Sequence, residues 1–222
     1  MTDTELDHDQ NLIVIRSPTA VTFTGVDERT DIRACAELSK DYPIEWGFLL
    51  SETRQENRYS GINLIPKAHA MGLQISLHLC GRVARRTMES GVFPEVAHHC
   101  NRVQVNLRSH EYTWEGLSAL AKVKTTIMQT RDTSEWPLTP LDVQPLLDCS
   151  GGRGVELAEW PKTVPAQLVG YAGGFRPDNV ASYLRDFPDH PHGFWIDMES
   201  GVRTDDWLDL EKCKRVCEEV FK

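Results

Sequence analysis

The chain has 222 residues, 40% of them hydrophobic, and a formal net charge of −9 at pH 7. This length suits one domain with a sizeable core. An acidic protein repels phosphate backbones on average, so we expect no nucleic-acid partner. No segment approaches the roughly 18–20 apolar residues of a membrane span, and the acidic start lacks the features of a secretory signal. We therefore expect a cytoplasmic protein with no membrane partner.

Strand-like and helix-like segments alternate along the chain. We expect residues 1–12 to be a disordered tail and residues 13–222 to form a single domain. Helical patterns are clear at Asp31–Asp41, Val83–Ser90 and Leu208–Phe221. The predicted strands are Ala20–Thr24, Ile44–Leu50, Gln74–Leu79, Arg102–Leu107, Thr125–Thr130, Val143–Asp148, Gln167–Ala172 and Gly193–Met198.

This alternation predicts an α/β fold with parallel strands joined by crossover helices. Eight such units in about 200 residues favour a closed (β/α)8 TIM barrel over an open sheet. No Gly-x-Gly-x-x-Gly follows the first predicted strand, which argues against a dinucleotide-binding fold.

Cysteine and histidine usage gives little support for a metal or a disulfide framework. Six cysteines are too sparse for a disulfide scaffold, so reduced thiols are expected. A metal site is considered and disfavoured, because part of the set is expected near the opposite face of the barrel; we predict no metal and no cofactor. The residues concerned are His78, Cys80, His98, His99 and Cys100.

Two glycine turns at the ends of the last two strands predict a phosphate site. Gly173 and Gly174 end the seventh strand, and Pro177 is expected in the first turn of the next helix. Ser200 and Gly201 follow the eighth strand. In barrels, phosphate sites are often built from these two loops. Ordinary turn formation is the alternative for each.

Asp148, at the end of the sixth strand, is a candidate general acid. A carboxyl in a barrel mouth can be desolvated, which raises its pKa. The alternative is that Asp148 caps the glycine loop after it, which contains Gly152. Arg54 and Arg58 can clamp a substrate carboxylate or be solvated loop residues.

These motifs resemble the phosphoribosylanthranilate isomerase family, barrel enzymes of tryptophan biosynthesis. The resemblance covers roughly residues 20–220 and is specific in the C-terminal half, where residues 172–180 read AGGFRPDNV and residues 196–202 read IDMESGV. The family's Asp and Gly-Gly-x-Gly, followed by Asp-Trp, are similar to Asp148, Gly151–Gly154 and Glu159–Trp160. Gly47–Phe48 and Arg58–Ser60 resemble its second-strand region.

The resemblance implies an Amadori-type aldose–ketose rearrangement with Asp148 as acid, but this chain departs from the family at the base. Thr24 stands where the family has its catalytic cysteine. Asp27, His78 and Cys80 are the alternatives as base. Glu199 replaces the first serine of the phosphate turn, and Arg203 is expected to balance its charge and join the phosphate site.

We expect a sugar-phosphate isomerase of this kind, acting as a monomer or homodimer on a small phosphorylated ligand. Two alternatives stay open: a related barrel enzyme with another substrate or reaction, and a non-catalytic phosphate-binding or scaffolding descendant. The convergence of acid and phosphate donors in one mouth distinguishes the enzymes from the scaffold.

Overall fold

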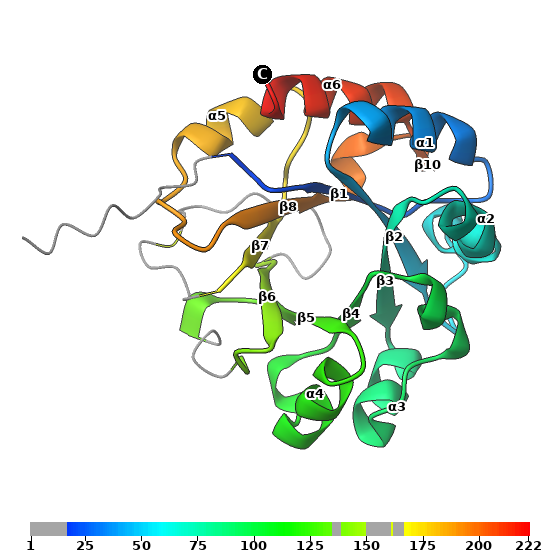
Figure 1. Ribbon diagram of the computed structural model, residues 1–222, viewed down its shortest axis with the longest axis vertical. Coiled ribbons are helices and arrows are strands. Elements are labelled where there is room, and N and C mark those ends of the chain that lie inside the picture. The colour runs from blue at the N-terminus through cyan, green and yellow to red at the C-terminus, as the bar shows by residue number, and fades with distance from the viewer. Residues whose placement is uncertain (1–16, 135–138, 150–160, 162–166) are drawn as a thin grey trace, which may run out of the picture.

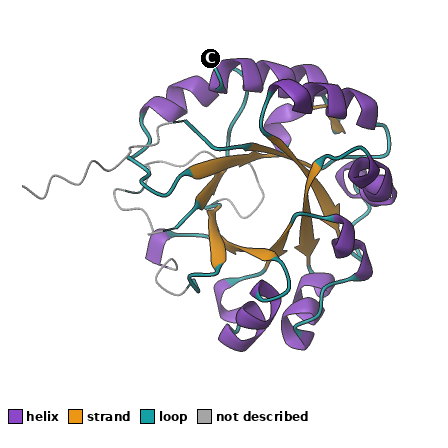
Figure 2. Ribbon diagram, in the orientation of Figure 1, coloured by secondary structure: helices purple, strands orange, loops and turns teal. Residues whose placement is uncertain are grey.

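The computed structural model describes residues 17–134, 139–149, 161 and 167–222. Eight parallel strands close into a barrel in chain order, and the register of Val21 with Ile196 joins β1 to β8. Helices lie around most of this ring (Figures 1 and 2), and among the described residues no α-helix lies between β5 and β6 or between β6 and β7. The predicted α/β barrel is therefore confirmed. The strands are β1 Val21–Thr24, β2 Ile44–Leu50, β3 Gln74–Cys80, β4 Arg102–Asn106, β5 Thr125–Thr130, β6 Val143–Leu147, β7 Val169–Ala172 and β8 Phe194–Met198.

Six α-helices lie in the described part of the chain, with short 3₁₀ turns between elements. The α-helices are α1 Ile32–Asp41, α2 Ile65–Ala70, α3 Arg82–Ser90, α4 Trp114–Ala121, α5 Val180–Arg185 and α6 Leu210–Val220. The 3₁₀ helices are η1 Asn57–Leu64, η2 Glu95–His99, η3 Ser109–Glu111 and η5 Ser200–Val202. A two-stranded antiparallel hairpin, β9 Arg203–Thr204 with β10 Trp207–Leu208, leads into α6. The tail proposed for residues 1–12 lies outside the described residues.

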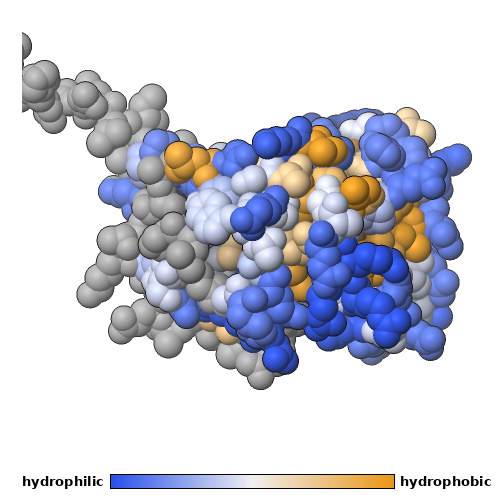
Figure 3. All heavy atoms as spheres, turned by 90° about the horizontal axis from the view of Figure 1, so that it is seen from below, coloured by the Kyte–Doolittle hydropathy of each residue, from blue (hydrophilic) through white to orange (hydrophobic). Residues whose placement is uncertain are grey.

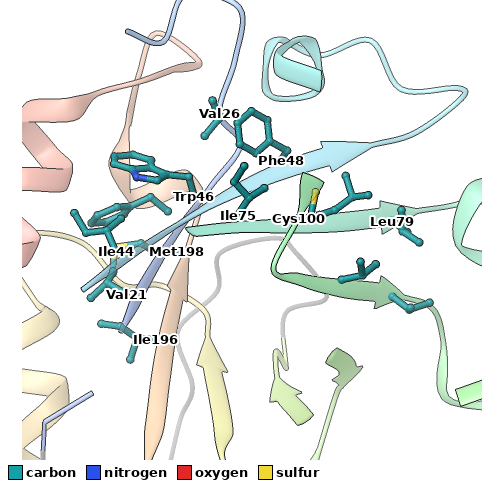
Figure 4. Packing of buried hydrophobic residues seen from close by; sticks show 14 of the residues in the cluster. Val21, Val26, Ile44, Trp46, Phe48, Ile75, Leu79, Cys100, Ile196 and Met198 are labelled. Atoms are coloured by element: carbon teal, nitrogen blue, oxygen red, sulfur yellow. The ribbon is translucent and has the colours of Figure 1, made fainter. Parts of the chain in front are cut away.

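Successive side chains of each strand alternate between the helices and the barrel interior, as the pleat requires. On β2, Ile44, Trp46 and Phe48 belong to the main hydrophobic core, and Figure 4 shows them with their neighbours from β1, β3 and β8. Glu45 and Leu49, on alternate positions, face inward, where Leu49 reaches the cavity at the barrel mouth.

The inside of the barrel is unusually polar at its amino-terminal end. Arg102 donates to both carboxylate oxygens of Glu45 at 2.8 and 2.5 Å and to Gln144 at 2.8 Å. Its guanidinium also lies 4.4 Å from the ring centre of Trp195. A small apolar group of Ile127, Leu146 and Trp195 belongs to the interior of strands β5, β6 and β8. Trp195 contacts the Arg102 guanidinium and Leu146 lines the cavity at the other end, so this group lies between the two.

One face of the molecule is seen as a space-filling view in Figure 3. Figure 3 shows hydrophilic residues over most of the described surface on that face, with hydrophobic residues in separate patches. Within the described residues, no helix is long and apolar enough to cross a membrane.

Candidate functional site

A cavity of about 190 Å³ opens at the carboxyl ends of the strands, where the active sites of such barrels form. Inward-facing residues make its floor, and the loops after β7 and β8 make one wall. The described lining residues are Thr24, Leu49, His78, Gln104, Asn106, Gln129, Leu146, Asp148, Ala172, Gly173, Gly174, Phe175, Arg176, Asp197, Met198, Glu199, Ser200 and Gly201.

Asp197, on β8, lies at the centre of a buried polar cluster. The Thr24 hydroxyl donates to its Oδ1 at 2.8 Å, and Nε2 of His78 lies 3.9 Å from its Oδ2. The Thr24 side chain has room for this orientation because its neighbour on β2 is Gly47: a Cβ there would lie 2.4 Å from the Thr24 hydroxyl oxygen. The glycine therefore permits the hydrogen bond from Thr24 to Asp197.

Burial determines the charge of this cluster. It raises the pKa of Asp197 to about 8, against the opposing effect of the Thr24 hydrogen bond. The acidic side chains of Glu45, Glu199 and Asp148 add to the rise. Burial also lowers the pKa of His78 to about 4. At neutral pH the histidine is therefore uncharged and the Asp197 carboxyl mostly holds its proton.

Asp148 follows β6 and points into the same cavity, as the sequence predicted. Its side chain is 4% exposed, and the Gln129 amide donates to its Oδ2 at 2.6 Å. Gln129 is the second-to-last residue of the neighbouring strand β5, so the sheet itself brings the pair together. Two carboxyl groups, Asp148 and Asp197, therefore face one small cavity from β6 and β8.

The glycine turns after β7 and β8 meet at the cavity wall. Gly173, Gly174, Ser200 and Gly201 all line it. The two turns touch at Gly201, where an added Cβ would lie 1.9 Å from the carbonyl oxygen of Phe175. Only glycine permits this approach. The predicted convergence of the four residues is present in the structure, and their binding of an anion stays a prediction.

The prediction that Pro177 opens a helix is wrong, because α5 begins three residues later, at Val180. The Asn179 side chain accepts from the amide of Arg176 at 2.7 Å and donates to the carbonyl of Gly174 at 2.9 Å. These two bonds close a turn over residues 176–179, ahead of the first residue of α5. The donors on this wall are therefore those of the turns themselves.

Arg58 balances the charge of Glu199. The guanidinium of Arg58, from η1, is ion-paired with Glu199 and with Asp206, the latter at 2.7 Å. Burial raises the pKa of Glu199, and Arg58 opposes this effect. Arg58 does not line the cavity, so its charge acts through Glu199.

Arg203 and Asp27 form a buried pair away from the cavity. Arg203 donates to Asp27 at 2.9 Å and to the carbonyls of Gly25 and Asp206. Asp27 also accepts from the amide of Leu208 at 2.7 Å. Neither residue is among the described lining residues. The structure therefore joins β1 to the hairpin through this pair and does not bring it to the phosphate turns.

The other predicted site residues lie apart from the lining. Arg54 is 60% exposed in its side chain and 3.8 Å from Glu56. Cys80 is bonded by Asn106 at 3.4 Å, and burial raises the pKa of its thiol, which disfavours the thiolate. Gly152 lies outside the described residues. Among those described, no cluster of three metal-ligating residues occurs.

Asp197, Gln104, Asn106 and Gln129 line the cavity although the sequence did not select them as site residues. The sequence feature that could have identified them is the presence of polar residues at inward positions near the ends of otherwise apolar strands. Asp197 was visible only as part of the eighth-strand motif.

Comparisons with known proteins agree on the fold. No protein-family model matches the chain, and no curated protein matches it by sequence. N-(5'-phosphoribosyl)anthranilate isomerase from Pyrococcus furiosus aligns over 90% of this chain and 98% of its own, with a TM-score of 0.59 and 14% identity. A truncated 3-deoxy-D-arabino-heptulosonate 7-phosphate synthase from Thermotoga maritima aligns over 93% and 89%, with a TM-score of 0.51 and 14% identity.

At this identity the comparisons establish a (β/α)8 barrel fold and leave the reaction to be argued from the cavity.

Proposed function

We propose that the protein is an isomerase of small sugar phosphates, interconverting an aldose or aminoaldose phosphate with its ketose form. The observation that carries the proposal is the meeting of two carboxyl groups, Asp148 and Asp197, with two glycine turns around one small cavity. The resemblance to phosphoribosylanthranilate isomerases, in sequence motifs and in fold, supports the same reaction class by analogy.

In this proposal the phosphate binds to the turns after β7 and β8. Gly173, Gly174 and Gly201 line the cavity without a side chain that would cover their backbone amides, and Ser200 adds a hydroxyl. Arg176, which also lines the cavity, supplies positive charge at this wall. The pairing of Glu199 with Arg58 reduces the repulsion that a free carboxylate would exert on the phosphate.

The two carboxyls then move the protons. Asp148 donates a proton to the ring oxygen as the bond from that oxygen to C1 breaks, and a lone pair of the nitrogen or oxygen on C1 forms a double bond to C1; an oxygen loses its proton in this step. Ionised Asp197 then removes the proton from C2. The C–H electron pair forms a double bond between C1 and C2, and the electron pair of the former C1 double bond moves to the nitrogen or oxygen, which in the oxygen case takes up a proton. Protonated Asp197 returns its proton to C1 as the enol O–H at C2 loses its proton and becomes the ketone carbonyl. A base whose pKa is about 8 is a strong acceptor and is still about one-tenth ionised at pH 7.

Asp197 thereby supplies the base that the sequence lacks at Thr24. The threonine hydroxyl donates to the Asp197 carboxyl, so its role in this proposal is to orient Asp197 and stabilise its charged form. His78, next to them, is neutral and contributes no charge that would hold Asp197 ionised at low pH.

The test is a steady-state isomerisation assay over a panel of aldose and ketose phosphates, phosphoribosylanthranilate included. For a substrate that turns over, Asp148→Asn and Asp197→Asn should each lower kcat by about 10²–10⁴-fold, the usual contribution of general acid–base catalysis. Asp142→Asn is the matched control, because Asp142 is exposed at the opposite end of the same strand as Asp148. Equal activity of all three variants would contradict the proposal.

A further inference from the structure

Two polar atoms on the cavity floor have no hydrogen-bond partner among the described residues. They are Nε2 of His78 and Oε1 of Gln104. Both residues are nearly fully buried, at 2% and 3% exposure, and both line the cavity. A buried polar atom without a partner destabilises a protein. Atoms of this kind, in residues that line a cavity, are therefore candidates for bonding with a ligand.

These atoms lie on neighbouring strands at the same level of the barrel. His78 on β3 is the direct register partner of Gln104 on β4. The Gln104 amide nitrogen donates to Asn106 at 2.9 Å, which fixes the orientation of the side chain and leaves its oxygen without a partner among the described residues. Asn106, itself a lining residue, is held by its bond to the Cys80 sulfur at 3.4 Å. The floor is thus a preorganised polar surface.

The charge of the cavity selects among polar ligands. Asp148, Asp197 and Glu199 bring carboxyl groups to it, whereas Arg176, on the phosphate wall, is the single arginine or lysine among the described lining residues. A ligand carboxylate would meet repulsion at the floor with no cation to bind it. Hydroxyl groups, which both donate and accept, suit a neutral imidazole and a carboxamide.

We infer that His78 and Gln104 bind the hydroxyl groups of the substrate's carbon chain, so that the ligand is a short polyhydroxylated sugar phosphate without a carboxylated aromatic substituent. The inference rests on the proposed function for the position of the phosphate, at the glycine turns. With the phosphate there, the carbon chain extends past Asp197 to the floor. The floor then distinguishes this chain's substrate from phosphoribosylanthranilate, which carries an aromatic carboxylate.

The experiment measures binding by isothermal titration calorimetry, which does not depend on turnover. The probes are D-ribose 5-phosphate, n-pentyl phosphate and inorganic phosphate, which share the phosphate and differ in hydroxyl groups. The wild type should bind ribose 5-phosphate at least about tenfold more tightly than pentyl phosphate, because two or more hydrogen bonds are added. A reduced, unreactive analogue of phosphoribosylanthranilate should bind more weakly than ribose 5-phosphate.

Gln104→Leu tests the role of the Gln104 side chain in binding. Gln104→Met is a second variant, with an unbranched side chain, for the case in which the leucine variant does not fold. Either should weaken ribose 5-phosphate binding about tenfold and leave pentyl phosphate and inorganic phosphate unchanged. Gln74→Leu, at an exposed position that begins β3, is the matched control and should bind all probes as the wild type does.

Three other outcomes would each contradict a different part of the inference. Equal affinity for ribose 5-phosphate and pentyl phosphate, or equal losses for both in the Gln104 variants, would refute hydroxyl recognition and leave the phosphate wall standing. Tightest binding of the aromatic analogue would refute the stated substrate class. Failure of every phosphate probe to bind would instead refute the phosphate site of the proposed function, and with it this inference.

Discussion

Asp197 combines two properties that oppose each other, a chemically useful pKa and a cost in stability. The carboxyl is 5% exposed, and burial raises its pKa from 3.8 to about 8. In the unfolded chain the same group ionises freely. Between these two values the folded protein holds a proton that the unfolded chain releases, so the contribution of Asp197 to stability falls as pH rises from about 4 to about 8.

Asp197→Asn should therefore stabilise the protein while removing activity. Asparagine is close in shape to the protonated carboxyl but loses no ionisation free energy on folding. We expect the free energy of unfolding to increase by about 1–3 kcal/mol at pH 8, with little difference from wild type at pH 4. Urea denaturation at both pH values measures this. A variant less stable than wild type at pH 8 would show that Asp197 is ionised and favourably bonded in the folded state.

Thr24 affects the pKa of Asp197 in the direction opposite to burial. Its hydroxyl donates to Asp197, and this bond lowers the carboxyl pKa. Thr24→Val keeps the branched shape and removes the donor, so the pKa of Asp197 should rise further. In wild type kcat/KM should rise with pH through about 8, since the ionised base is the active form. In Thr24→Val the rise should move to higher pH.

Thr22→Val is the control for this experiment, because the Thr22 hydroxyl donates to Glu45 at the other end of β1. Its pH profile should match that of the wild type. A wild-type kcat/KM that falls as pH rises through 8 would assign Asp197 as the acid instead of the base.

At the scale of elements, one wall of the cavity depends on contact between the turn after β7 and the turn after β8, which are far apart in the sequence. Gly201, in η5, lies against the backbone of Phe175, which follows β7. The predicted phosphate wall exists only while this contact holds. The strain that a side chain would add here is local, so it can be used to test the wall separately from the carboxyls.

Gly201→Ala should push the two turns apart and weaken inorganic phosphate binding about tenfold or more, with a stability loss of about 1–3 kcal/mol. Gly72→Ala separates the two effects. Gly72 has a φ of +75° in an open turn with nothing within 4 Å of an added Cβ, so alanine there costs about 1 kcal/mol of backbone strain and leaves binding intact. Unchanged phosphate affinity in Gly201→Ala would place the anion elsewhere.

The elements themselves were largely accessible from sequence. The ranges predicted for Ile44–Leu50 and Thr125–Thr130 agree with β2 and β5 as observed, because apolar runs bounded by turn residues mark buried parallel strands. The end of α5 nearest the glycine turn was not accessible. Its position depends on the Asn179 side chain bonding to Gly174 and Arg176, a choice made by turn geometry that periodicity does not encode.

The site residues also fall into two groups, those that could be predicted from the sequence and those that could not. Asp148 and the glycine turns follow strands directly, so the rule that strand ends converge at the barrel mouth was sufficient to place them. The ion-pair partners of Arg203 and Arg58 could not be assigned from sequence, because they depend on how side chains from distant segments pack together. Arg203 pairs with Asp27, and Arg58 with Glu199. Near Glu199, sequence proximity favoured the wrong arginine as its partner.

At the scale of the whole molecule, the barrel interior contains two polar regions with different tasks. The mouth carries the cavity, whereas the amino-terminal end carries the ion pair of Glu45 and Arg102, whose side chains are 7% and 14% exposed. Gln144 and the Thr22 hydroxyl complete the hydrogen bonds of this pair. A satisfied buried pair of this kind links four strands, and the charge of Glu45 also adds to the raised pKa of Asp197.

Glu45→Gln tests this division. The substitution preserves size but leaves the Arg102 guanidinium buried with no carboxylate, which typically costs about 3–5 kcal/mol. We expect a loss of this order in the free energy of unfolding, measured by urea denaturation at pH 7, with ribose 5-phosphate affinity changed less than about twofold. Glu37→Gln is the control, because Glu37 pairs with Lys40 on the exposed surface of α1, where an ion pair contributes at most about 1 kcal/mol. Ile127, Leu146 and Trp195 lie between the two ends of the barrel, since Trp195 contacts Arg102 and Leu146 lines the cavity. The charge of Glu45 also reaches His78 and Asp197. A stability loss in Glu45→Gln accompanied by a large loss of ligand affinity would show that these residues or this charge transmit the disturbance and that the interior acts as one unit.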